Sequence, residues 1–402
     1  MDLLALSAAE VGATVLVSRG VAVLVGLMLL WAAIMAAAGV MLVPRPSSQK
    51  LALLVSRTCH FVFKTIAMRA KNYVQLDRLL AVQGPTTVLL YLALFLLIFV
   101  GAFAFLFYGV TGSPPSEAFY RAGSSMSTLG VVNASGFCAL TVMFVAAFTG
   151  TTVISVFIGF LLTLYSAYTE RETFMSKIAM LCGEPGWGPE MVVRLHRLEA
   201  TVDAGEAGKC VDWICAMRVS QYIYPLLNHF RSPVRDRHWA VSLLAILDTA
   251  AIRVAAIDPE PDMDLVRILA QGADALHALK LSEVSSTGHD DGQSAMMTWI
   301  IGEKMLHPDK NEPLPDPGIT RAEWDEAMRF LTTYGIALKP DADLAWRIFC
   351  RIRGQYVEPA YFLTNHLAAV NAPWSGPRHP AFEFPLIRPI LARKFFAGST
   401  KV

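Results

Sequence analysis

The residues of this chain whose types and spacing could do chemistry lie between positions 111 and 136. Residues 127–136 are rich in small and hydroxylated side chains and show no helical periodicity. Residues 116–126, just before them, predict an amphipathic helix that is too short to cross a bilayer. Apolar segments flank both stretches, and non-helical backbone at membrane depth is tolerated only where it lines a polar cavity or is buried in protein. This order of elements indicates a pore loop, and an inert external hairpin is the alternative.

Residues 119–131 resemble the pore helix and selectivity filter of the two-transmembrane potassium channel class. In that class a Thr-Val-Gly-Tyr-Gly strand lines the ion path with carbonyl oxygens. Thr128 and Gly130 match its first threonine and first glycine, and Leu129 stands for its valine. The resemblance covers roughly residues 85–170. It implies a homotetramer that conducts potassium or another monovalent cation, because each chain supplies one pore loop and a central filter needs four.

Three positions depart from the filter of this class. Val131 replaces the aromatic residue, Val132 stands where the second glycine belongs, and the uncharged Asn133 stands at the usual aspartate position. A β-branched residue at positive φ is an outlier, whereas glycine adopts that conformation readily. We therefore expect an altered outer ion site and modest selectivity for potassium. The predicted ion-conducting filter consists of Ser127, Thr128, Leu129, Gly130, Val131, Val132 and Asn133.

The composition places this loop in a membrane protein. Of the 402 residues 54% are hydrophobic and only 17% are charged, against about 25% charged in ordinary globular chains. This excludes a wholly soluble enzyme and a disordered or fibrous chain. The net charge of +1 gives no drive toward nucleic acid. The six cysteines form no C-x-x-C pair, and no nucleophile–base or metal constellation emerges, so we expect neither an enzyme nor a cofactor.

Three segments are long and apolar enough to span a hydrocarbon core, namely residues 20–43, 86–110 and 137–169. The third exceeds one span, so we expect its end to continue into the cytosol. Gly150 and Gly159 interrupt it. In the channel class an inner-helix glycine often acts as a gating hinge, so both are hinge candidates. Ordinary helix packing through small residues is the alternative.

The connector between the first two spans fixes the predicted orientation. Residues 44–85 carry seven basic residues against the single acid Asp77. The positive-inside rule places this connector in the cytoplasm. The N-terminus and residues 111–136 are then outside, and residues 170–402 are inside. The sequence thus predicts a multi-pass protein of the cell membrane.

Five basic residues of this connector recur every seven positions. Seven residues overshoot two helical turns by only about 20° per repeat, so on one helix these charges would form a slowly drifting stripe. Such a stripe beside apolar flanks suits a helix that lies on an anionic inner leaflet. The alternative is a charged helix face packed on the C-terminal domain. The predicted lipid-facing stripe consists of Lys50, Arg57, Lys64, Lys71 and Arg78.

From residue 170 onward the pattern is helical, and Thr320 and Glu323 form a capping box that opens one of the helices. No glycine-rich dinucleotide motif and no phosphate-binding loop occurs in the sequence. An acidic cluster at residues 258–264 lacks EF-hand spacing and is more typical of a helix start. Four histidines have no partner at metal-ligand spacing, which favours hydrogen-bonded structural roles for His60, His196, His229 and His366.

The predicted fold is an all-α membrane protein with three transmembrane helices, a re-entrant pore helix with a filter loop, and an all-α cytosolic domain. Its predicted parts are residues 1–45 (N-terminus and first span), 46–84 (basic interfacial helix), 85–169 (pore domain) and 170–402 (cytosolic domain). The predicted function is a tetrameric cation channel. A membrane-anchored signalling or scaffold protein with a vestigial pore is the alternative, and the ligand of the cytosolic domain is left open.

Overall fold

The computed structural model describes residues 2–41, 50–131, 135–198, 204–260, 262–284, 313–378 and 385–399. These residues form helices joined by turns and loops, and no strand occurs among them. The prediction of an all-α protein is therefore confirmed for this part of the chain. In chain order the elements are α1 (Asp2–Met41), α2 (Lys50–Ala67), α3 (Tyr73–Ala81), α4 (Gln83–Thr111), α5 (Pro115–Met126), α6 (Phe137–Cys182), α7 (Gly188–Arg197), α8 (Ala204–Ile223), the 3-10 helix η2 (Pro225–His229), α9 (Trp239–Ile252), the π-helix η3 (Arg253–Ile257), α10 (Met263–Val284), α12 (Arg321–Thr333), α13 (Ala342–Arg353), α14 (Val357–His366) and α15 (Ile390–Ser399).

Four helical segments are long and apolar enough to cross a membrane: Thr14–Met41, Tyr73–Thr111, Phe137–Cys182 and Trp239–Ile257. The first three overlap the spans that the sequence predicts, and they support the prediction of a membrane protein. The fourth differs from them because 89% of its most apolar stretch is buried in the protein, against 33% or less for the others. Its apolar character is explained by burial among other helices.

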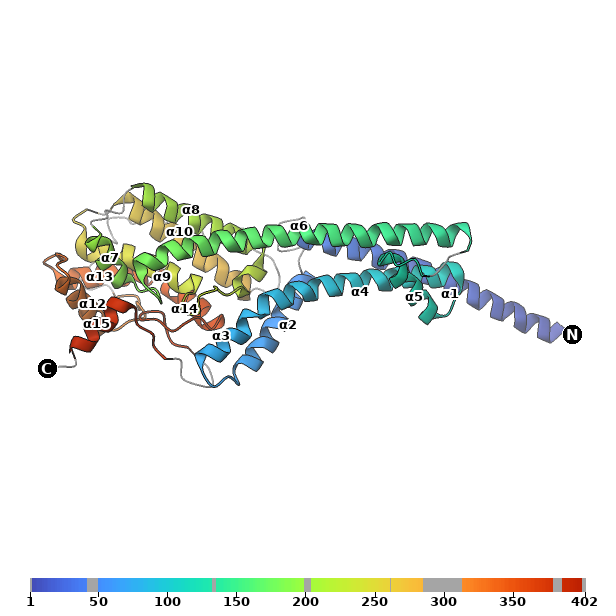
Figure 1. The fold of residues 1–402 in the computed structure, drawn as a ribbon, viewed down its shortest axis with the longest axis horizontal. Helices are drawn as coiled ribbons and strands as arrows, with labels where there is room; N and C mark the ends of the chain where they lie inside the picture. Colours follow the sequence, from blue (N-terminus) through green and yellow to red (C-terminus); the bar gives the residue numbers. More distant parts are fainter. Residues whose placement is uncertain are drawn as a thin grey trace. The chain divides into compact units, whose positions relative to one another are not determined.

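The chain divides into two compact units (Figure 1). The first unit consists of Met1–Ser56 and Pro85–Tyr165, and the second of Arg57–Gly84 and Ser166–Val402. The continuous helix α6 contributes its beginning to the first unit and its end to the second. Residues 57–84, which the sequence places in a separate interfacial segment, group with the C-terminal helices.

In the first unit, α1 and α4 pack as an antiparallel pair. Near the middle of α1, the Arg19 guanidinium donates to the carbonyls of Gly109 (3.0 Å) and Val110 (2.7 Å) in the last turn of α4. Further along α1, a Cβ on Gly26 would lie 2.9 Å from the Leu106 side chain. Residue numbers therefore increase along α1 while those of the contacting residues on α4 decrease, which is an antiparallel arrangement. Arg19 also satisfies two of the carbonyls that a helix C-terminus leaves without partners.

The second unit is built around α9. All fourteen residues of this helix are buried, and α7, α10, α13 and α14 pack against it. Its one carboxylate, Asp248, accepts hydrogen bonds from Arg353 (2.9 and 3.2 Å) and from the hydroxyl of Tyr356 (2.8 Å). Burying a charge is costly unless it is paired and hydrogen-bonded, and here both conditions are met.

The predicted stripe of five basic residues does not lie along one helix. α2 ends at Ala67, and α3 starts only at Tyr73. The break has a local cause, because the Asn72 side chain accepts a hydrogen bond from the backbone N–H of Gln75 (3.0 Å) and so caps a new helix. The expectation of one continuous helical stripe was therefore wrong, and Lys71 lies in the turn.

Two local predictions from the sequence agree with the structure. α6 continues to Cys182, beyond the predicted third span. The predicted capping box is confirmed, since Thr320 and Glu323 exchange side chain to backbone hydrogen bonds (3.2 and 2.7 Å). The sequence also predicts a helix at residues 293–306, which lie outside the described residues.

Candidate functional site

Helix α5 is held in the first unit by a face of small residues. Ala118 and Ala122 are buried, and they belong to a cluster with the aromatic side chains of Phe99 and Phe103 on α4. The exposed side carries an ion pair one turn apart, between Arg121 and Glu117 (2.7 Å). Small residues let two helices approach closely. The short helix predicted at residues 116–126 is therefore present as α5, and it packs on the apolar helices of its own unit.

The chain leaves α5 through a tight turn. The backbone N–H of Leu129 donates to the carbonyl of Ser124 (3.0 Å), and that of Val131 donates to the Ser124 hydroxyl (3.2 Å). One serine near the end of the half-helix thus fixes the next seven residues. The structure describes the predicted filter from Ser127 to Val131, and Val132 and Asn133 lie outside the described residues.

The backbone of this loop alternates in handedness. Thr128 has φ of +57° and Gly130 has φ of +64°, while Leu129 between them stays out of the left-handed region. A left-handed threonine is uncommon because its Cβ is branched. The side chains of Leu129 and Val131 are 70% and 64% exposed. The loop therefore presents its side chains outward from the first unit in a conformation that ordinary loops rarely adopt.

Gly150 brings α6 into direct contact with the end of α5. A Cβ at this position would overlap the carbonyl oxygen of Met126 and lie 2.9 Å from its carbonyl carbon. A side chain therefore cannot be accommodated without moving backbone. Around Gly159, no atom lies within 4 Å of an added Cβ. Neither observation tests a hinge, but the first gives Gly150 a packing role beside the predicted filter.

One exposed side of α6 carries a series of hydroxyls. Thr151, Ser155, Gly159 and Thr163 follow one another at four-residue spacing, and all four are exposed. The three hydroxyls donate to carbonyls one turn earlier, at 3.1, 2.9 and 3.0 Å. Each hydroxyl oxygen keeps acceptor capacity. The same side of the helix also exposes the large apolar side chains of Phe148 and Leu162, so this surface is of mixed polarity.

Two of the basic residues in the predicted stripe bond to the C-terminal helices of their own unit. The Arg57 guanidinium donates to the carbonyl of Glu283 (3.5 Å), and the Lys64 ammonium donates to the carbonyl of His366 (3.2 Å). Burial lowers the pKa of Lys64. The other two whose side chains are described, Lys71 and Arg78, are exposed. The alternative of a charged face packed on the C-terminal helices therefore fits Arg57 and Lys64. A lipid-facing role stays a prediction for Lys71 and Arg78.

Three of the four singled-out histidines come together in the second unit, which the sequence does not predict. The ring of His60 on α2 lies 4.6 Å from that of His229 on η2 and 4.7 Å from that of His366 on α14, between ring centroids. Glu283 on α10 lies 3.5 Å from the Nε2 atom of His366. The fourth, His196, is exposed near the end of α7.

The histidine cluster is surrounded by specific polar groups. The Nδ1 atom of His60 lies 3.1 Å from the amide nitrogen of Gln83, and its Nε2 atom is buried without a hydrogen-bond partner among the described residues. The Asn228 amide donates to Glu283 (2.7 Å). Burial, together with neighbouring histidines, lowers the pKa of His60 to about 3, and burial also lowers that of His229. Burial alone would raise the pKa of Glu283, but His229, His366 and the Asn228 amide outweigh it and lower that pKa to about 2.

The cluster is not arranged as a metal site. The lone pairs of an imidazole lie in the plane of the ring, so face-to-face rings cannot direct their nitrogens to a common ion. The planes of His60 and His229 are inclined by only 24°. Accordingly, no group of three or more His, Cys, Asp or Glu residues in the described ranges could hold a metal ion.

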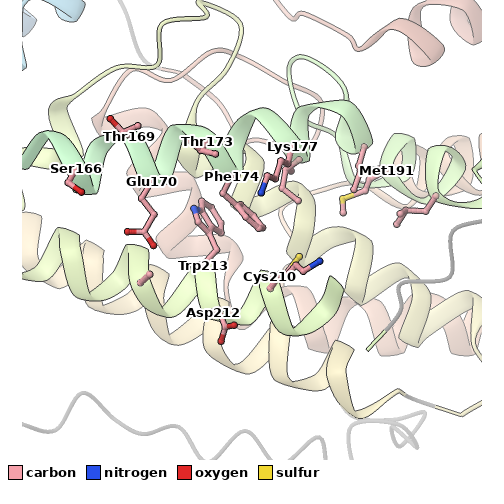
Figure 2. A pocket seen from close by; sticks show the side chains of 15 residues that line it. Ser166, Thr169, Glu170, Thr173, Phe174, Lys177, Met191, Cys210, Asp212 and Trp213 are labelled. Carbon is pink, nitrogen blue, oxygen red and sulfur yellow. The ribbon is translucent and has the colours of Figure 1, made fainter. Parts of the chain in front are cut away.

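The second unit also contains a cavity between α6 and α8. Its volume is about 1160 Å³, and Figure 2 shows its lining side chains. The rings of Phe174 and Trp213 stack there with centroids 4.5 Å apart. Charged groups of both signs surround this aromatic pair, with Glu170 and Lys177 on α6 and Asp212 on α8. The mixture of charges selects no single class of ligand.

Comparisons of this chain with models of protein families, with curated proteins and with solved structures found no match. What the chain does must therefore be argued from the loop after α5, the exposed face of α6 and the helices that hold them.

Proposed function

We propose that this chain is the subunit of a homotetrameric cation channel in the cell membrane. Each subunit contributes α4, α5, the loop at residues 127–133 and the first part of α6 to a central pore. The observation that carries the proposal is the backbone of alternating handedness at Thr128 and Gly130, held at the end of an anchored half-helix. The resemblance of residues 119–131 to a potassium channel filter points the same way.

Alternating handedness matters because it turns successive carbonyl groups toward one side of the strand. Rings of such carbonyls replace the hydration shell of a cation in channel filters. No donor from the described residues reaches the carbonyl oxygens of Thr128, Leu129 or Gly130. In a tetramer, four copies of each carbonyl would face a common axis. A single subunit offers only one quarter of such a ring.

The exposed hydroxyl face of α6 supplies the second argument. Thr151, Ser155 and Thr163 form a polar strip on an apolar helix, and Gly150 sets the start of that strip beside the end of α5. In the proposed channel this strip lines the cavity on the cytosolic side of the filter. At 3.6 residues per turn, the large exposed side chains of Phe148 (75% exposed) and Leu162 (66% exposed) lie on the same side of the helix as these hydroxyls, so the proposed cavity wall is partly apolar.

The proposed orientation follows the basic connector, with the N-terminus outside and the second unit in the cytoplasm. Selectivity is proposed to be modest because Val131 and Val132 replace residues that complete a potassium filter. Replacing Val132 by Gly should raise the preference for potassium over sodium if it restores the outer site. The permeant species is potassium or another monovalent cation, and no cofactor is proposed.

The second candidate function is a membrane-anchored signalling or scaffold protein with a vestigial pore. The cavity between α6 and α8 favours it, because that cavity belongs to the second unit and the proposed filter to the first. Native mass measurement of the full chain in mild detergent separates the two candidates. Four copies per particle support the channel, and a single copy supports the scaffold.

A further inference from the structure

The histidine cluster joins elements that are far apart in the sequence. His60 comes from α2, His229 from η2 and His366 from α14, while Glu283 comes from the end of α10. His229 is only 8% exposed, and the side chain of Glu283 is 9% exposed. Neutral imidazole rings can stack, whereas imidazolium rings repel each other at this distance. The contacts between these four elements therefore depend on the protonation of a few rings.

We propose that His60, His229, His366 and Glu283 form an acid-sensitive latch, which holds η2 and α14 against α2 while the rings are neutral and releases η2 when a second ring becomes protonated. The ligand of this site is the proton, and the cluster is called the histidine latch below. The latch does not depend on the proposed channel. Its effect on ion flow does rest on that proposed function.

The charges around the latch set how many protons it can hold. With neutral rings the latch carries one negative charge, on Glu283. The first added proton is compensated, because His366 lies 3.5 Å from the Glu283 carboxylate. A second proton must reside on His60 or His229, whose rings lie 4.6 Å apart. Among the residues that the structure describes, no second carboxylate faces them, and the other charged groups at the latch, Lys64 and Arg57, are cationic.

The contact at His60 also favours the neutral form. The amide nitrogen of Gln83 lies 3.1 Å from Nδ1, so the amide donates to that nitrogen and Nε2 carries the proton. Protonation of His60 would place two donors face to face. The amide of Gln83 would then have to rotate, which offers its oxygen instead. Gln83 thus acts as a positioning residue for the neutral ring.

Release of η2 would reach α6 through a short chain of hydrogen bonds. The buried guanidinium of Arg171 on α6 donates to the carbonyls of Leu227 (2.9 Å) and Phe230 (2.6 Å), within and just after η2. The hydroxyl of Tyr168, also on α6, donates to the carbonyl of Arg231 (3.1 Å). All three accepting residues lie within two positions of His229. Movement of η2 therefore removes partners from the part of α6 in the second unit.

The size of the effect follows from proton linkage. A histidine that stays neutral in the closed latch and titrates near its ordinary pKa of 6.5 after release favours release by about 25-fold between pH 7 and pH 5. The sign is fixed by the direction of the shift, because a histidine whose pKa is lowered in the closed state stabilises that state above pH 6.5 and loses this stabilisation as the pH falls. Two such histidines act in the same direction.

Hydrogen exchange of the full-length protein in lipid nanodiscs tests the latch without any current measurement. Backbone amides of residues 226–231 should lose protection by at least about 20-fold between pH 7 and pH 5, after correction for intrinsic exchange rates. In His60→Phe, which keeps an aromatic ring but cannot be charged, this loss should shrink by about 25-fold or disappear. The matched control His196→Gln removes an exposed histidine and should behave as the wild type does.

A second variant keeps the test decisive if His60→Phe folds poorly. Glu283→Gln removes the carboxylate that compensates the first proton, so release should begin at a higher pH than in the wild type. A merely structural role would lower protection equally at both pH values in either variant. Equal protection of residues 226–231 at pH 7 and pH 5 in the wild type would overturn the proposal. So would an unchanged pH dependence in both His60→Phe and Glu283→Gln.

Discussion

Two glycines of α6 provide a matched pair of substitutions with opposite expected signs. Gly150→Ala places a methyl group 2.9 Å from the carbonyl carbon of Met126 and onto its oxygen, whereas Gly159→Ala meets no atom within 4 Å. Ordinary carbon contacts are about 3.5–4.0 Å. The overlapped atoms belong to the backbone at the end of α5, so relief requires that α5 or α6 shift.

The matched pair isolates the steric cost. Replacing Gly by Ala inside a helix contributes about 1 kcal/mol of helix propensity at either site, so this contribution cancels in the comparison. Overpacking costs about 1–3 kcal/mol. Gly150→Ala should therefore be less stable than Gly159→Ala by about that amount, which thermal unfolding of both variants in the same detergent measures. Equal unfolding temperatures would refute the close contact between Gly150 and Met126.

Three further substitutions test other parts of the structure. Thr128→Ala should change relative permeability to potassium and sodium, measured from reversal potentials, because the left-handed threonine positions the proposed filter. Asp248→Asn should lower the free energy of unfolding by about 3–5 kcal/mol in denaturant titrations, because it leaves the buried Arg353 without its counter-charge; an effect below about 1 kcal/mol would contradict this. Lys71→Gln should weaken binding to anionic vesicles by about 1 kcal/mol. Lys64→Gln removes the hydrogen bond to the carbonyl of His366 and should mainly alter stability.

The apolar helices and the half-helix could be predicted from the sequence because their signals are local. A long charge-free run, a short amphipathic segment and a stretch of small residues each lie within about 35 consecutive positions. The same locality explains the predicted capping box at Thr320, where both partners are three residues apart. The break between α2 and α3 is also local, but the seven-residue charge period hid the cap that Asn72 provides.

The histidine latch could not be predicted, because its three histidines are each separated by more than one hundred residues. His60 and His229 share no spacing pattern, and only the packing of α2 on η2 brings their rings together. The role of Gly150 was hidden for a similar reason, since a glycine in a helix looks the same in sequence whether it hinges or packs. The burial of α9 likewise depends on the helices around it. By length and hydropathy alone, residues 239–257 would qualify as a membrane span.

Planar-bilayer recording of the purified full chain in opposed potassium and sodium gradients tests the central claim most directly. The proposed tetrameric pore predicts discrete cation currents whose reversal potential shows a modest preference for potassium and moves in Thr128→Ala. Latch release predicts in addition that these currents depend on pH on the side of the second unit. Absence of current at every voltage and pH tested, from protein that native mass shows to be folded and tetrameric, would contradict the claim that the chain forms a cation channel.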